Sequence, residues 1–131
     1  MWMSRRLRSP AMSRKPITTR VVNLEDGHPT ASEALLRLDR AITDARRDEV
    51  AIVKLIHGYG SKGVGGRIKE EVANALARHK RSGLIRDYIT GEDFRISNQP
   101  TWDLLKHSPE LKQDRDLSRN NRGITLIIFD F

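Results

Sequence analysis

Residues 50–67 read VAIVKLIHGYGSKGVGGR, an apolar run followed by a basic, glycine-rich stretch. The apolar run predicts a central β-strand that is covered on both faces or nearly so. Glycine allows positive φ and a close approach of the backbone to a ligand, and a helical pattern begins near Arg67. The stretch is therefore predicted to be a strand-to-helix turn, where free amide groups at the helix start favour anions.

The side chains of this turn add full positive charges to the amide dipoles. His57 is the first residue of the turn, directly after the predicted strand, and two roles are open for it. It is either a catalytic or phosphate-contacting group, or a structural ring that holds the loop by hydrogen bonds to the backbone. Tyr59 would stack on a base. We predict a phosphate cradle made of Gly58, Tyr59, Gly60, Ser61, Lys62, Gly63, Gly65, Gly66, Arg67 and Lys69.

Outward from this turn, the hydrophobic pattern predicts alternating strands and helices. The first helix is expected to begin at a capping box formed by Thr30 and Glu33. Short crossovers imply parallel strands with right-handed connections. The expected fold is a two-layer α/β sandwich with a mixed sheet of about four strands in the order β-α-β-α-β-β. Strands are predicted at residues 20–24, 50–56, 84–89 and 124–129, and helices at 31–47 and 67–82.

Residues 91–121 form a long irregular insertion before the last strand. They are polar and punctuated by prolines and by Asn120-Asn121, and only residues 101–107 predict a short helix. A segment of this length with little structure of its own is usually functional or mobile. Trp102 is expected to fill the core within it, and His79 is expected to be partly buried on the inner face of the second helix.

Composition and charge limit the function classes. The 131 residues carry 24 basic and 17 acidic residues and no cysteine, which excludes disulfides, thiolate catalysis and cysteine-bound zinc. Residues 1–16 are predicted to be a basic, disordered arm that either follows a phosphate backbone or is a solvated tail, and residues 17–131 to be one domain. We expect a cytoplasmic protein with no membrane segment and with nucleic acid as its partner.

The turn after the second strand resembles a family motif. Leu55-Ile56-His57-Gly58-Tyr59-Gly60 is similar to the HGxGxG motif of Smr domains, the small MutS-related domains. The order of elements from Val21 to Phe129 is similar to that family as well. A second family motif, LDxHG, follows the first strand. Counting back from the capping box places Glu25 at its aspartate and Gly27 at its histidine, and His28 is displaced by one residue.

The resemblance implies binding of RNA or structured DNA, free or on the ribosome, and in some members a weakly specific endonuclease activity. The carboxyl ends of parallel strands meet at one edge of a sheet, where such sheets bind ligands. The candidate catalytic set at that edge is therefore Glu25, Asp26, His28 and His57. We expect no cofactor and no transition-metal site, while a loosely held magnesium would fit Glu25 and Asp26.

One alternative stays open. Residues 58–63 also satisfy the GxGxxG fingerprint of dinucleotide-binding turns, with Asp87 at about the right separation for a ribose contact. The chain would then be a nucleotide- or phosphosugar-binding enzyme that uses the same loop. It is too short for a complete dinucleotide domain, and the glycines are not followed by the lysine and hydroxyl pair of a nucleoside-triphosphate loop.

Overall fold

The computed structural model describes residues 18–59 and 64–130. The predicted arm at residues 1–16 lies outside the described residues, and so do Gly60, Ser61, Lys62 and Gly63 of the predicted cradle. No helix in the described part of the chain is long and apolar enough to cross a membrane.

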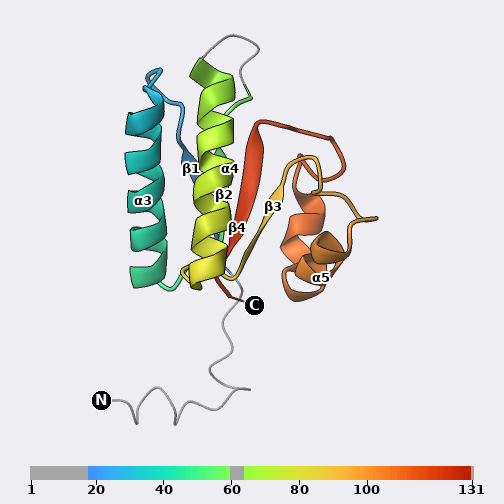
Figure 1. Ribbon diagram of the computed structural model, residues 1–131. Coiled ribbons are helices and arrows are strands. Elements are labelled where there is room, and N and C mark those ends of the chain that lie inside the picture. Colours follow the sequence, from blue (N-terminus) through green and yellow to red (C-terminus); the bar gives the residue numbers. More distant parts are fainter. Residues whose placement is uncertain (1–17, 60–63, 131) are drawn as a thin grey trace, which may run out of the picture.

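Four strands form one mixed sheet in the order β1-β2-β4-β3 (Figure 1). Strands β1 and β2 are parallel, whereas β4 is antiparallel to both of its neighbours, β2 and β3. The predicted α/β fold with a mixed four-stranded sheet is confirmed, and the last strand in the sequence lies inside the sheet. The strands are β1 (Thr19–Asn23), β2 (Ile52–Ile56), β3 (Asp87–Thr90) and β4 (Ile124–Ile128).

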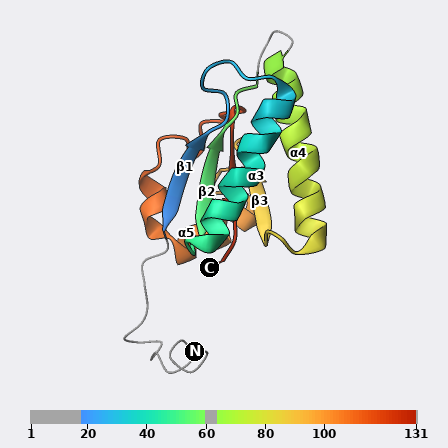
Figure 2. The ribbon, with the colours of Figure 1, turned by 90° about the vertical axis from the view of Figure 1, so that its left-hand side faces the viewer.

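Two long helices, α3 (Ala31–Arg47) and α4 (Val64–Ser82), cover one face of the sheet (Figures 1 and 2). Helix α3 begins at the predicted capping box, where Glu33 N–H donates to Thr30 Oγ1 and Thr30 N–H donates to the Glu33 carboxylate. Helix α4 begins before the predicted start, so that Gly65 and Gly66 lie in its first turn. Apolar side chains of both helices pack on strand residues that include Val53, Leu55 and Ile127.

The insertion covers the opposite face of the sheet. It contains α5 (Gln99–His107) and the 3-10 helix η1 (Pro109–Gln113), and Figure 2 shows α5 on the side of the sheet away from α3 and α4. The sheet and its two long helices therefore carry a partial third layer. The second apolar cluster joins the insertion to the strands and contains Phe94, Leu104, Leu105 and Leu111 with Ile52, Ile89, Ile124, Leu126 and Ile128.

A buried lysine fixes the insertion to the sheet. Lys54, in the middle of β2, is 8% exposed, and its ammonium donates to Asp114 Oδ1 at 2.9 Å and forms an ion pair with Asp116. Asn121 Nδ2 donates to Asp116 Oδ1 at 2.9 Å. Burial alone would lower the pKa of Lys54, but the two carboxylates outweigh it and raise the pKa above 10.5. The lysine is therefore charged and held by the insertion.

The two ends of the insertion meet beside β4. Gly91 N–H donates to the Ile124 carbonyl at 2.9 Å, and a Cβ at position 91 would overlap the carbonyl oxygen of Asn121. Glycine is required here because the two backbone segments touch.

Two sequence expectations are wrong. The third strand begins at Asp87, because the amides of Leu84 and Ile85 donate to the His79 carbonyl and belong to the turn that ends α4. Trp102 is 46% exposed, since Thr101, Leu104 and Leu105 form the buried side of α5. His79 is partly buried as expected.

Candidate functional site

The carboxyl ends of β1 and β2 lie at the same end of the sheet as the first turn of α4, at the top of Figure 1. Backbone hydrogen bonds join the segments there. Leu24 N–H donates to the Ile56 carbonyl at 2.8 Å, and the amides of His57 and Gly58 both donate to the Gly123 carbonyl, at 2.9 and 3.0 Å. The residues that precede β4 are thus part of this edge, beside the two predicted motifs.

Gly58 is the point at which the chain leaves β2. Its φ of +70° lies in the left-handed region that glycine adopts at little cost. A Cβ on Gly58 would overlap Oε2 of Glu25 and lie 3.2 Å from the Cδ of the same side chain. The carboxylate at the end of β1 therefore lies directly against the first glycine of the cradle, so the fold brings these two predicted site residues together.

His57 is buried, at 1% exposure, and both of its ring nitrogens are hydrogen-bonded. Nδ1 lies 2.6 Å from the Gly58 carbonyl oxygen, and Nε2 lies 2.8 Å from Oγ1 of Thr125. A carbonyl oxygen only accepts, so Nδ1 carries the proton, and the neutral ring accepts the Thr125 hydroxyl proton at Nε2. The contacts correspond to the structural role considered for this ring, while a catalytic role stays a prediction.

Burial is the main cause that lowers the pKa of His57 below its ordinary value of 6.5. Lys69 acts in the same direction, whereas the Gly58 carbonyl and the carboxylates of Glu92 and Glu25 oppose it. The ring is therefore neutral at pH 7, in agreement with its hydrogen bonds.

The turn at residues 25–28 holds the other predicted catalytic residues. The Glu25 amide donates to Asn23 Oδ1 at 2.9 Å, and Nη1 of Arg37 donates to the Asp26 carbonyl at 2.6 Å. Asp26 and His28 are exposed, and His28 has a φ of +54°. All four predicted catalytic residues thus lie at one end of the sheet. In the part of the chain that the structure describes, no group of three or more histidine, aspartate or glutamate side chains could hold a metal ion.

Basic groups gather around the glycine turn. Arg67 is exposed in the first turn of α4, and Nζ of Lys69 pairs with Oε2 of Glu92 at 2.8 Å. The guanidinium of Arg122 lies 4.9 Å from the centre of the Tyr59 ring. Burial would raise the pKa of Glu92, but the hydrogen bond with Lys69 and the positive charges of Lys69 and Arg122 help to lower it below its ordinary value. Glu92 and Arg122 are site residues that no sequence pattern indicates, because only the position of β4 in the sheet brings them to this edge.

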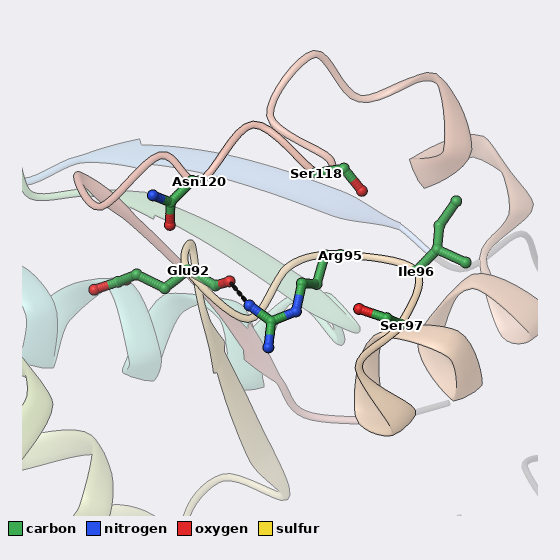
Figure 3. Close-up of a pocket in the computed structure, with 6 residues that line it drawn as sticks. All are labelled: Glu92, Arg95, Ile96, Ser97, Ser118 and Asn120. Carbon is green, nitrogen blue, oxygen red and sulfur yellow. Dashed lines mark hydrogen bonds between the residues drawn. The ribbon is translucent and has the colours of Figure 1, made fainter.

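A shallow pocket of about 280 Å³ lies on the insertion side of Glu92 (Figure 3). Nη1 of Arg95 donates to the Glu92 carbonyl at 3.1 Å, and the Glu92 side chain extends away from the other lining residues. None of the residues that line the pocket belongs to residues 57–59 or to the first turn of α4. Its lining consists of Glu92, Arg95, Ile96, Ser97, Ser118 and Asn120.

Asp87, the proposed ribose contact of a dinucleotide site, is not near the glycine turn. It is paired in register with Ile128, which in turn pairs with Ile52 at the start of β2, whereas Gly58 follows the end of that strand. Its carboxylate lies 3.0 Å from Nζ of Lys80, near the end of α4. Asp87 therefore lies at the opposite end of the sheet and could not contact the ribose of a dinucleotide bound at the glycine turn.

Comparisons with known proteins agree with this fold. The family model of the Smr domain matches residues 27–92, which is half of the chain. A relative, Endonuclease MutS2 of Thermus thermophilus, is 35% identical over 63 residues, which cover 48% of this chain and 8% of that protein. The crystal structure of the Smr domain of Thermus thermophilus MutS2 has a TM-score of 0.52 at 21% identity and shares the fold over 86% of this chain and 99% of its own. The chain belongs to the Smr domain family.

Proposed function

We propose that this chain binds nucleic acid, RNA or structured DNA, at the end of the sheet around Gly58. The observation that carries the proposal is the cluster of basic groups at the family motif. Arg67, Lys69 and Arg122 surround a glycine turn whose backbone is fixed to β4. A relative that shares part of this chain is named an endonuclease, which supports a nucleic-acid ligand.

The phosphate backbone is the part of the ligand that this surface would hold. Arg67 lies in the first turn of α4, where unpaired amides give the helix start a partial positive charge. A phosphate there would receive amide hydrogen bonds and a charge-assisted bond from the guanidinium. Lys62, which lies outside the described residues, is proposed to add a further cation to the same cradle.

Binding is proposed as the primary activity, and weak phosphodiester cleavage as a secondary one. Both ring nitrogens of His57 are engaged, so the carboxylate of Glu25 at Gly58 is the better candidate to direct a water molecule. Glu25→Gln would test this role, because it removes the charge and keeps the shape of the side chain. We expect it to abolish any cleavage while the affinity for the oligonucleotide changes little.

The binding proposal is tested by fluorescence anisotropy with short labelled RNA and DNA oligonucleotides over a range of salt concentrations. Arg67→Ala should weaken binding and reduce the salt dependence by about one counterion, since one phosphate contact is lost. Arg81→Ala is the matched control, because it removes the same charge from an exposed position at the other end of the same helix. Equal effects of the two variants would contradict a site at Gly58.

The same assay separates this proposal from the nucleotide-binding alternative. A free mononucleotide offers few phosphates, so it should compete weakly with an oligonucleotide for a surface that holds a backbone. Saturable thermal stabilisation by a mononucleotide, without binding of oligonucleotides, would support the small-molecule enzyme instead.

A further inference from the structure

The exposed ring of Tyr59 and the guanidinium of Arg122 form a pair at the edge of the glycine turn. Tyr59 is 49% exposed, and the centre of its ring lies 4.9 Å from the Arg122 guanidinium carbon. This separation is within the range of a cation–π contact. Because the guanidinium lies over one face of the ring, a base could stack only on the opposite face.

The backbone fixes the position of this pair. Tyr59 follows Gly58 and Arg122 precedes Gly123, and the amide of Gly58 donates to the Gly123 carbonyl at 3.0 Å. A Cβ on Gly123 would lie 3.3 Å from the Cα of Gly58, so the two glycines let the segments approach closely. The ring and the guanidinium therefore extend from two backbone segments that are held together, and the ring is placed in advance of any ligand.

An exposed aromatic ring between basic groups is typical of surfaces that bind single strands. Bases in a duplex are stacked on one another, whereas an unpaired base offers its face to an aromatic side chain. Lys69 is paired with Glu92 at 2.8 Å, and the positive charge of Arg122 also helps to lower the pKa of that carboxyl group. The charge fits the phosphate of a nucleotide whose base lies on the tyrosine.

We propose that Tyr59 and Arg122 hold an unpaired nucleotide, with its base stacked on the free face of the Tyr59 ring and its phosphate beside Arg122. The inference rests on the proposed nucleic-acid binding and names the ligand class of that site: single-stranded or locally unpaired RNA or DNA. The contact reads the presence of a free base and not its identity, because every base has a face that stacks.

The test compares a single strand, a fully paired hairpin of the same sequence, and a single strand with abasic sites that keeps the phosphates. Tyr59→Ala should weaken binding of the single strand by about 5- to 150-fold, which corresponds to the loss of one stacked base. Tyr59→Phe should bind like the unaltered protein, because the ring remains. Arg122→Ala should also weaken binding of the single strand. The abasic strand should bind weakly, and Tyr59→Ala should not weaken it further.

Two controls keep the outcome clear. Trp102→Ala removes an aromatic residue of similar exposure from α5 and should leave every affinity unchanged. The melting temperature of Tyr59→Ala should match that of the unaltered protein, since the ring is outside the core.

Failure of the stacking proposal can be distinguished from failure of the proposed nucleic-acid binding on which it rests. If the abasic strand and the hairpin bind as well as the single strand, and Arg67→Ala still weakens all of them, the stacking is overturned and the nucleic-acid site remains. If no oligonucleotide binds, the proposed function falls and the stacking falls with it.

Discussion

The two faces of the sheet are buried in different ways. On one face, α3 and α4 pack apolar side chains that recur with helical spacing onto the strands. On the other face, a short helix, a 3-10 helix and loops pack on the strands and hold Lys54 between Asp114 and Asp116. A buried ion pair adds little net stability, yet it penalises every arrangement in which one partner is missing. The insertion, which has little regular structure, is thus positioned on the sheet by a buried ion pair as well as by apolar contacts.

The largest effect is expected from truncating one fully buried residue on each face. Leu38→Ala on the helical face should lower the free energy of unfolding by about 2–5 kcal/mol, and Phe94→Ala on the insertion face by about 3–5 kcal/mol. Both clusters share the sheet, so each variant should unfold in a single transition. Urea unfolding followed by circular dichroism and tryptophan fluorescence measures both. Separate transitions for Phe94→Ala would show that the insertion unfolds independently of the sheet and its two long helices.

The next effect concerns the buried charge. Lys54→Met should destabilise the protein by about 3 kcal/mol at pH 7, because it leaves two carboxylates in a mostly buried site without their cation. Adding Asp114→Asn and Asp116→Asn to the same chain should restore much of this loss. Urea midpoints of the single and triple variants are the measurement. A Lys54→Met protein as stable as the original would show that apolar contacts alone position the insertion.

A pH effect on stability is expected from His57 between pH 5 and 8. His57 has a lowered pKa, so the unfolded chain takes up its proton first as the pH falls below 6.5. The stability contributed by His57 is complete above pH 6.5 and is lost on acidification, at up to about 1.4 kcal/mol per pH unit. Lys54 and Asp116 titrate outside this window, because the pKa of Lys54 lies above 10.5 and that of Asp116 below 3.8.

The free energy of unfolding, measured from pH 5 to pH 8, tests this effect. His57→Gln should remove the slope below pH 6.5, and His79→Gln, which alters a partly exposed ring, should retain it. A flat profile in the unaltered protein would contradict the neutral, buried ring.

The smallest effect is expected from Lys69, whose ion pair with Glu92 links α4 to the insertion. The two side chains are 27% and 35% exposed, so solvent screens their attraction. Lys69→Met should change the free energy of unfolding by less than about 1 kcal/mol. Lys80→Met, which removes the partner of Asp87 at the other end of the helix, is the control for stability. A loss as large as that of Lys54→Met would make Lys69 a second anchor of the insertion.

Local patterns predicted the part of the fold that local interactions determine. The capping box at Thr30, the apolar strand around Val53 and the turn at Gly58 each depend on residues that are close in the sequence. The position of Glu25 in the family motif was also predicted from a local pattern, because it was found by counting back from the capping box. The family and the α/β fold were therefore predictable.

Contacts between distant segments were not predictable in the same way. Lys54 looks like an interruption in an apolar strand, and its partners Asp114 and Asp116 lie in an irregular segment with no pattern to indicate them. The pairing of Tyr59 with Arg122 depends on β4 lying next to β2, which the order of elements does not determine. For Trp102 the sequence suggested a contact that does not exist. Its size predicted burial in the core, but its position on α5 leaves it exposed.

The contact between Gly91 and Asn121 has a consequence for the length of the insertion. Thr90 and Thr125 face each other on neighbouring antiparallel strands, so residues 91–123 are, in connectivity, the loop of a β-hairpin. The entropy of closing a loop rises only slowly with its length, so this connection can lengthen or shorten at little cost to the pairing of its strands. Its apolar residues, however, cover Ile52 and Leu126. The segment is free to vary as a connection, but a two-residue turn in its place would uncover one face of the sheet.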